Sequence, residues 1–341
     1  MNIIDKIKQA GLVGRGGAGF PTHLKWQAVK NASSKTKYLV INGAEGEPGV
    51  YKDKYILINH LDKLAKGVKL AFDYISATKV YFYLNPKYFD EYKKNIISSF
   101  DKVGLKGKFE LFKKPSKAGY IGGEESTILN IIEGELLEPR LKPPFPTECG
   151  LFSQPTLINN IETLYNVSLV DKGKYKNNRF YSINIISNNI SKNKGVYELS
   201  SDLTIAEVLK TTGNYPKYKF FVQIGGDAAG EVLNDKQLDQ KVSGAGSITI
   251  FDFKKHNPEK LVKFWFDFFA DNSCGQCTPC REGTYRLREM FNETKSVAKL
   301  LNNNKLLEIT ENLNLASFCV LGSSVPVAIL SYLKNVYNPN K

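Results

Sequence analysis

Four of the five cysteines in this sequence have the spacing of an iron–sulfur ligand set. Cys274, Cys277 and Cys280 lie in the run SCGQCTPCREG, and Cys319 follows far downstream in ASFCVLG. Two residues between successive cysteines let three thiolates converge from one loop, and a distant fourth thiolate completes the ligands of a [4Fe–4S] cluster. Since the run lacks the Cys-Pro continuation of a two-cluster ferredoxin, we predict one cluster and a role in electron transfer.

Zinc is the main alternative occupant of these thiols. Structural zinc sites usually use two separated pairs of ligands, so a three-plus-one arrangement fits zinc less well without excluding it. Arg281 and nearby backbone N–H groups could stabilise the negative charge of a cluster. The remaining cysteine, Cys149, lies alone in a proline-rich loop and is interpreted as a thiol without a special role. This uneven pattern indicates a metal site in a reducing compartment rather than a disulfide framework.

A glycine-rich loop near the start of the sequence is the second candidate site. Gly14, Gly16 and Gly19 match the pattern Gly-x-Gly-x-x-Gly of dinucleotide-binding loops. A Rossmann fingerprint follows a strand, whereas a helix-like segment precedes this loop, so the standard Rossmann interpretation is rejected. Glycines let a backbone approach a ligand closely, and N–H groups at a helix start favour a phosphate. A tight structural turn is the alternative, but it does not explain the combination with Phe20 and Lys25.

The segments around this loop predict an α/β layer. Strand-like stretches at 37–42, 79–84 and 108–112 alternate with helix-like stretches at 61–76 and 87–101. Such alternation is typical of a sheet covered by helices. The connecting loops are rich in Gly, Glu and Pro, and long loops of this kind are often functional.

Two further regions follow this layer. From about residue 178 to 254 the order strand, strand, helix, strand predicts a small mixed domain that is β-grasp-like. The remainder is mostly helical and contains the clustered cysteines. We therefore predict three domains, an α/β domain over 1–175, a β-grasp-like domain over 176–255 and a helical metal-binding domain over 256–341.

Charge and hydropathy argue against two classes of partner. The net charge is +13, from 47 Lys and Arg against 34 Asp and Glu, but the lysines are scattered and no nucleic-acid-binding motif accompanies them. The start, MNIIDKIKQA, lacks the apolar core and cleavage site of a secretory signal. The uncharged stretch 315–333 contains serines, a glycine and a proline, and predicts a buried turn and a core helix rather than a membrane span. We expect no nucleic acid and no membrane span, and a cytoplasmic protein that could dock peripherally on a membrane complex.

Six motifs in a fixed order give the sequence a family resemblance. They are GRGGAGFPTHLKW, NGAEGEPGVYKD, GYIGGEEST, PRLKPPFPTECGL, LINNIETL, and SCGQCTPCREG with its distant SFCVLG. Together they resemble the flavoprotein subunit of respiratory complex I and its relatives in NAD-linked hydrogenases and formate dehydrogenases, from about residue 11 to 333. NGAEGEP and His23 are also similar to the flavin-and-cluster subunit of Rnf-type ferredoxin:NAD oxidoreductases. The resemblance implies a flavin-binding α/β domain, an SLBB-type β-grasp domain and a helical [4Fe–4S] domain.

The resemblance also implies a cofactor site. FMN would lie in a cleft of the first domain, with NADH stacked on the flavin ring. The implied FMN contacts are Gly14, Gly16, Lys25, Asn42, Glu45, Gly123, Glu124, Asn159, Asn160 and Thr163. The implied NADH contacts are Phe20, Phe145, Glu47 and Glu125. Of the last two, which would orient the hydride donor, Glu47 is the candidate catalytic residue. Each glutamate also has an alternative interpretation as a solvated loop charge.

The implied activity is electron transfer from NADH, or to NAD in the reverse direction. FMN accepts a hydride and releases single electrons to the cluster, and a thioredoxin-like [2Fe–2S] subunit of a larger redox complex would take them onward. Three positions depart from the family pattern, with Ala44 in place of Asp, Gly46 in place of Ser and Ala28 in place of an aromatic. Ala28 and Ala44 favour an alternative, a relay or docking subunit without nucleotide turnover. A zinc-stabilised ligand-binding module is a third hypothesis.

Overall fold

The computed structural model describes residues 1–186 and 193–337, and these residues divide into two units. The first unit comprises Met1–Gly46 and Tyr51–Phe180; the second comprises Glu47–Val50 and the described chain from Tyr181 onward. The first boundary lies close to the predicted domain end at 175. The predicted division at 255/256 stays a prediction, because the sheet and the helices on its two sides pack together within the second unit.

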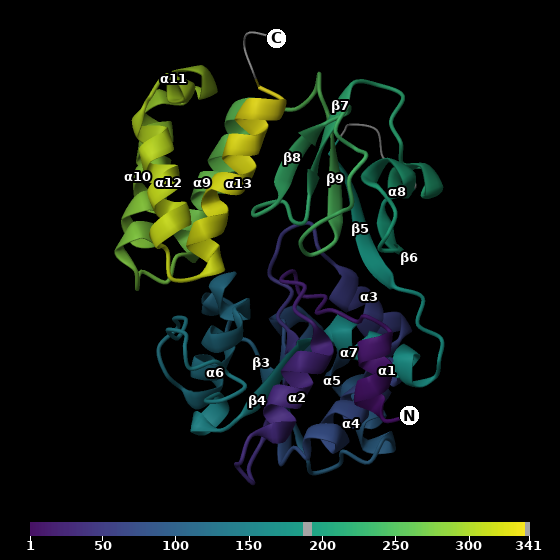
Figure 1. Ribbon diagram of the computed structural model, residues 1–341. Coiled ribbons are helices and arrows are strands. Elements are labelled where there is room, and N and C mark those ends of the chain that lie inside the picture. Colours follow the sequence, from purple (N-terminus) through teal and green to yellow (C-terminus); the bar gives the residue numbers. More distant parts are fainter. Residues whose placement is uncertain (187–192, 338–341) are drawn as a thin grey trace. The chain divides into compact units, whose positions relative to one another are not determined.

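A four-stranded parallel sheet forms the centre of the first unit (Figure 1). In spatial order its strands are β3 (Phe109–Lys113), β2 (Lys79–Leu84), β1 (Tyr38–Gly43) and β4 (Thr156–Asn160). The middle strands are almost wholly apolar and buried, as expected where helices cover both faces of a parallel sheet. The sequence predicted β1, β2 and β3 to within a residue, whereas β4 was not recognised as a strand.

Seven α-helices accompany this sheet in the described part of the first unit. They are α1 (Ile3–Gln9), α2 (Thr22–Asn31), α3 (Lys52–Asn59), α4 (Leu61–Ile75), α5 (Pro86–Lys102), α6 (Glu125–Glu133) and α7 (Ile161–Asp171). The helix α4 buries Leu64 and Val68 on one face and packs against α7. A Cβ atom at Gly67 would lie 1.8 Å from the carbonyl oxygen of Leu164, so this close approach requires glycine.

The strand order of the first unit reverses between β1 and β4. From β1 the chain moves outward to β2 and β3 on one side, and only later adds β4 on the other side. In open parallel sheets, ligands bind outside the carboxyl ends of the strands at such a switch point. Here those ends carry Asn42 on β1 and Asn159 and Asn160 on β4. The fold therefore predicts a ligand site at three of the residues that the resemblance implied.

The second unit contains a five-stranded mixed sheet. In spatial order its strands are β6 (Gly195–Ser200), β5 (Asn178–Ile186), β9 (Ser247–Asp252), β7 (Phe220–Ile224) and β8 (Glu231–Asn234). The strands β5 and β9 pair in parallel, β7 pairs antiparallel with β9, and β8 pairs antiparallel with β7. The helix α8 (Ile205–Thr211) begins with a capping box between Thr204 and Glu207 and buries its apolar face on the sheet. This is the β-grasp arrangement that the sequence predicted.

Five helices complete the second unit. They are α9 (Pro258–Asn272), α10 (Thr278–Thr294), α11 (Val297–Leu301), α12 (Lys305–Ala316) and α13 (Val320–Asn335). The helices α9, α10, α12 and α13 pack side by side (Figure 1). The core helix predicted within 315–333 is α13, but the predicted buried turn before it is wrong, because Phe318 and Val320 are 57% and 70% exposed. No described helix is long and apolar enough to cross a bilayer.

Candidate functional site

Four segments of the first unit meet at the carboxyl ends of β1 and β4. The Asn42 side chain donates a hydrogen bond from Nδ2 to the carbonyl oxygen of Gly123, at 3.0 Å. The Asn160 side chain donates to the carbonyl oxygen of Asn42, at 3.3 Å. A Cβ atom at Gly16 would lie 3.4 Å from the Cβ of Asn160. The structure thus brings together the glycine loop, both strand ends and the Gly-Glu-Glu segment.

The glycine loop is closed at its base and exposed at its tip. Val13 and Pro21 form an antiparallel bridge, and the Gly14 N–H donates to the carbonyl oxygen of Phe20 at 2.8 Å. The Arg15 N–H donates to Thr163 Oγ1 at 2.9 Å. Residues 16–20 between these anchors are exposed. The loop therefore presents its backbone beside the junction of β4 and α7, as a phosphate-binding loop requires.

Two of the implied FMN contacts act here as positioning residues. The Thr163 side chain is fully buried and accepts the Arg15 bond, so it anchors the glycine loop. The Asn159 side chain is 6% exposed, and its Oδ1 accepts a hydrogen bond from Trp26 Nε1 at 2.8 Å. This bond fixes α2 against the end of β4. Direct contact of either side chain with FMN stays a prediction.

A charged network joins α2 to the start of α6. Lys25 Nζ lies 2.8 Å from Glu125 Oε2, and Lys142 Nζ lies 3.0 Å from Glu124 Oε1 and 3.1 Å from Glu125 Oε1. Although burial opposes it, the two ammonium groups hold the pKa of Glu125 below its usual value. Sequence reasoning missed Lys142, although it lies in the quoted motif PRLKPPFPTECGL. Both lysines could turn to a bound phosphate or ribose if the pairs with Glu125 opened.

Two of the implied glutamates cap helices. Glu124 Oε2 accepts hydrogen bonds from the N–H groups of Ser126 and Thr127 at the start of α6, each at 2.8 Å. Glu45 accepts from the N–H groups of Asp53 and Lys54 at the start of α3. Carboxylates at helix starts satisfy backbone donors that have no partner within the helix. Both glutamates therefore fix the loops that border the site.

A buried charged cluster lies under the end of β4. Lys52 Nζ lies 2.8 Å from Asp53 Oδ1, 2.9 Å from Asn160 Oδ1 and 3.2 Å from Glu162 Oε2. Lys52, Asp53 and Glu162 are each at most 2% exposed. Burial raises the pKa of Glu45, which lies beside this cluster, to about 8; Asp53 adds to the rise and Lys52 opposes it. The cluster fixes the orientation of Asn160. Its members lie in the quoted motifs NGAEGEPGVYKD and LINNIETL, but sequence reasoning gave them no role.

The aromatic residues expected to contact NADH are accessible. Phe20 is 54% exposed and Phe145 is 51% exposed. Large apolar side chains left in water at loop positions are available to stack on a ligand. Ala28, on α2, is also exposed and offers no second aromatic face.

Glu47 belongs to the second unit. Its Oε1 accepts hydrogen bonds from the N–H groups of Ala228 and Ala229, at 2.9 and 3.2 Å. The neighbouring Pro48 carbonyl accepts a hydrogen bond from the Asp227 N–H at 3.0 Å. These bonds tie the segment 47–50 to the loop between β7 and β8. A role for Glu47 in orienting a hydride donor stays a prediction.

The four clustered cysteines gather at two helix starts in the second unit. Cys274 lies between α9 and α10, Cys277 immediately precedes α10, Cys280 lies in its first turn, and Cys319 immediately precedes α13. Burial raises the pKa of the Cys280 thiol to about 11; the Ser273 hydroxyl opposes the rise, and the three other thiols add to it. All four thiols therefore share one local electrostatic environment.

A glycine allows these helix starts to approach. A Cβ atom at Gly322 would lie 3.2 Å from the Cβ of Cys280 and 2.2 Å from Ser317 Oγ. Arg281 Nη1 donates to the carbonyl oxygen of Gly275 at 2.9 Å, which braces the cysteine loop. The first turns of α10 and α13 thus hold their cysteines side by side.

The number and type of these four ligands match those of a [4Fe–4S] cluster. Within residues 1–186 and 193–337, no group of three or more His, Cys, Asp or Glu side chains has the arrangement of ligands around a single metal ion. Zinc with bonds of about 2.3 Å would hold its sulfurs roughly 3.8 Å apart. A cubane carries one thiolate on each iron and therefore spaces them more widely, and four cysteines are its usual ligands.

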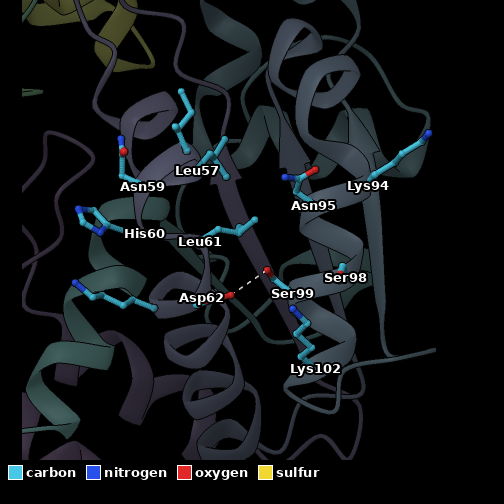
Figure 2. Close-up of a pocket in the computed structure, with 12 residues that line it drawn as sticks. Leu57, Asn59, His60, Leu61, Asp62, Lys94, Asn95, Ser98, Ser99 and Lys102 are labelled. Carbon is cyan, nitrogen blue, oxygen red and sulfur yellow. Dashed lines mark hydrogen bonds between the residues drawn. The ribbon is translucent and has the colours of Figure 1, made fainter.

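The first unit contains a pocket of about 620 Å³ (Figure 2). It is lined by the junction of α3 with α4 and by one face of α5. Ser99 Oγ donates to Asp62 Oδ1 at 3.2 Å across it. No residue expected to hold FMN, NADH or iron lines this pocket.

Comparison with known families gives two matches along the chain. Residues 7–169 match the Nuo51 FMN-binding domain. Residues 260–338 match the NADH-ubiquinone oxidoreductase-F iron-sulfur binding region. The first match contains the site at the ends of β1 and β4, and the second contains all four clustered cysteines.

Individual relatives align over nearly the whole chain. The F subunit of the NADH-quinone oxidoreductase of Streptomyces coelicolor is 31% identical over 98% of this chain and 81% of the relative. NADP-reducing hydrogenase subunit HndC of Solidesulfovibrio fructosivorans is 30% identical over 98% of this chain and 74% of the relative. A crystal structure of NAD⁺-reducing [NiFe]-hydrogenase superposes with a TM-score of 0.88 at 27% identity, covering 98% of this chain. The present chain spans 61% of that hydrogenase chain.

Proposed function

The chain belongs to the family of the F subunits of NADH-quinone oxidoreductases, and from that premise we propose that it is an NADH-oxidising flavoprotein subunit. When bound, FMN supplies the chemistry that links a two-electron hydride donor to a one-electron carrier. The chain binds FMN in the first unit and the [4Fe–4S] cluster in the second. Electrons could equally run in reverse, so that the same residues serve NAD reduction.

The convergence of four segments at the switch point carries this proposal. Gly16 lies against Asn160 at the start of α7, and the exposed backbone of the glycine loop would favour the FMN phosphate there. Asn42 ends β1, the strand next to β4, and its side chain is hydrogen-bonded to Gly123. Both residues would border the flavin ring. The remaining residues around the site, Glu45, Glu124, Asn159 and Thr163, hold these groups in place.

Cys274, Cys277, Cys280 and Cys319 would hold the cluster. Their convergence at the starts of α10 and α13 supports this assignment. A [4Fe–4S] cluster takes four thiolates, and the only further cysteine in the sequence is Cys149. We propose that the electrons pass from this cluster to a carrier on another chain.

The nucleotide would bind with Phe20 and Phe145 against its rings. Lys25, Lys142 and Glu125 would contact its polar groups, and Glu47 would orient the hydride donor. The relatives include NAD-linked and NADP-linked proteins, so NADH rather than NADPH is a proposal that rests on the acidic residues.

The partner that receives electrons would be a thioredoxin-like [2Fe–2S] subunit within a larger redox complex, at the cytoplasmic face of a membrane. The family supports a place in a multisubunit assembly. Phe318 and Val320 flank Cys319 and are exposed, which leaves this ligand accessible to a docking chain.

Anaerobic reconstitution with FMN, iron and sulfide, followed by addition of NADH or NADPH, tests the proposal. We expect a flavin spectrum with an iron–sulfur shoulder, and bleaching of the flavin by NADH. Flavin that binds but is not bleached by either nucleotide would favour the relay alternative, for which Ala28 and Ala44 are the supporting positions. A colourless protein with bound zinc would contradict both.

A further inference from the structure

Lys114 is a buried lysine at the edge of the sheet that carries the proposed FMN site. It follows β3 directly, and its N–H donates to the carbonyl oxygen of Leu84 at the end of β2, at 2.9 Å. Because the strands are parallel, this is the same edge at which Asn42 ends β1. Lys114 is only 6% exposed.

The Lys114 side chain lies between two loops, and the residue of each loop that lies against it is a glycine, Gly46 or Gly122. A Cβ atom at Gly46, in the loop after β1, would lie 3.4 Å from Lys114 Nζ. A Cβ atom at Gly122, in the segment before α6, would lie 3.2 Å from Lys114 Cε; Ala118 also requires a small residue there. The ammonium group therefore lies between the loop that follows Asn42 and the segment that contains Gly123.

The Lys114 ammonium lacks a counter-ion within the described chain. No residue of 1–186 or 193–337 accepts a hydrogen bond from its Nζ or lies within ion-pair distance. Burial alone lowers its pKa to about 8. Lys52 in the same unit is as deeply buried, but Asp53 and Glu162 neutralise it. A largely buried charge without a counter-ion is unfavourable, so a ligand that supplies negative charge would stabilise this lysine.

The sheet order indicates which part of FMN would reach Lys114. The glycine loop and the start of α7, which favour the phosphate, belong to β4 at one edge of the sheet. Lys114 extends β3 at the opposite edge, with β1 and β2 between. A flavin laid across the strand ends would therefore bring its ring, not its phosphate, toward Lys114.

We propose that Lys114 is a further cofactor-binding residue, whose ammonium contacts the pyrimidine edge of the flavin ring and stabilises reduced FMN over oxidised FMN. Oxidised flavin is neutral on its ring, whereas two-electron reduction places a negative charge on the pyrimidine portion at neutral pH. A nearby ammonium in a low-dielectric site favours the charged form. The inference rests on the proposed function, because it requires FMN at this site.

Anaerobic binding titrations of FMN with the whole chain test this inference. Dissociation constants for oxidised and chemically reduced FMN are measured for the wild type, for Lys114→Met and for the control Lys113→Met. Lys113 is the adjacent, exposed lysine, paired with Asp90 at 2.7 Å. In Lys114→Met we expect the dissociation constant of reduced FMN to rise at least tenfold more than that of oxidised FMN. This corresponds to a drop of about 30 mV in the two-electron potential of the bound flavin. In Lys113→Met the ratio of the two constants stays at the wild-type value.

Thermal unfolding of the FMN-free chain gives a second readout. Lys114→Met removes an unpaired buried charge, so its melting temperature should rise while its preference for reduced FMN falls. Lys114→Gln should show the same loss of preference, which keeps the test open if the methionine variant folds poorly.

Three outcomes would overturn the inference. Equal weakening of oxidised and reduced FMN in both Lys114 variants would assign Lys114 to packing. An unchanged ratio of the constants would remove it from the cofactor site, while FMN binding by the wild type left the proposed function standing. Failure of the wild type to bind either form of FMN would overturn the proposed function, and the inference with it.

Discussion

The two candidate cofactor sites of this chain are built in different ways. The cysteine site consists of four thiols, whose main use in such a cluster is to bind a metal. These ligands lie at two helix starts. At the ends of β1 and β4, most of the polar side chains already bind one another. Glu45 and Glu124 cap helices, and Thr163 anchors the glycine loop. The metal site therefore depends on its ligands, whereas the flavin site depends on open backbone and on the residues that hold that backbone in place.

Cysteine replacement should have the largest effect and should separate the two sites. Cys319→Ser removes the ligand that joins α13 to the cysteine loop of α10, so we expect nearly complete loss of iron and sulfide with FMN still bound. Iron analysis and the visible spectrum measure the loss. Cys149→Ser is the matched control and should keep the full iron content. Equal iron contents in both variants would contradict the ligand assignment.

A larger side chain in the glycine loop should have the opposite effect, loss of FMN with iron retained. In Gly16→Val the new side chain would crowd Asn160, whose Cβ lies 3.4 Å from a Cβ at position 16. We expect FMN affinity to fall by about two orders of magnitude with iron content unchanged, as measured by flavin fluorescence and iron analysis. Ala18→Val, at an exposed position of the same loop, should bind FMN normally. Normal FMN binding by Gly16→Val would place the cofactor elsewhere.

The buried carboxyl of Glu45 should make the stability of the chain depend on pH. Its pKa is raised to about 8 by burial, with Asp53 adding and Lys52 opposing. A raised acid pKa favours the folded state below the unfolded pKa, and this contribution is lost as pH rises toward 8. Between pH 5 and 8 wild type should lose up to about 1.4 kcal/mol per pH unit relative to Glu45→Gln. Denaturant unfolding at each pH measures this difference. If the free energies of unfolding of the two proteins differ by the same amount at every pH in that range, Glu45 is already ionised.

Glu47 should show the smallest effect on cofactor content. Glu47→Ala removes the acceptor for the N–H groups of Ala228 and Ala229, so the second unit should lose about 1–3 kcal/mol of stability. FMN and iron contents should stay at wild-type values, as checked by absorbance and metal analysis. A fall in kcat/KM for NADH without a change in FMN affinity would support its predicted role toward the hydride donor. Loss of FMN would instead make it a flavin contact.

The sequence predicted the fold wherever hydrophobic pattern alone decides it. The segments for β1 and β2 are largely apolar runs, and β3 places Glu110 among Phe109, Leu111 and Phe112, so their pattern was sufficient. In contrast, β4 is short and ends in Asn159 and Asn160, and becomes a strand because it pairs with β1. The short strand β8 likewise depends on β7 and on α13, whose Ser331 accepts a hydrogen bond from the Val232 N–H.

The candidate site was predictable where residue type restricts the chemistry. Cysteine spacing and clustered glycines identified both regions, because thiolates bind metals and glycines let a backbone approach a ligand. The cluster of Lys52, Asp53 and Glu162 was missed because only the fold brings its members together. Lys114 was missed for the same reason, since one lysine among many carries no pattern until its burial and lack of a counter-ion are seen.

The most direct test of the account follows electrons from the first site to the second. Reconstituted protein is mixed with NADH under anaerobic conditions, frozen, and measured by electron paramagnetic resonance for a reduced [4Fe–4S] cluster, beside Gly16→Val, which should keep the cluster but lose FMN. The account predicts a reduced-cluster spectrum in wild type and none in the variant. A cluster that NADH reduces equally in both, or that NADH leaves oxidised in FMN-loaded wild type while dithionite reduces it, would contradict the claim that this chain passes electrons from NADH through FMN to iron–sulfur.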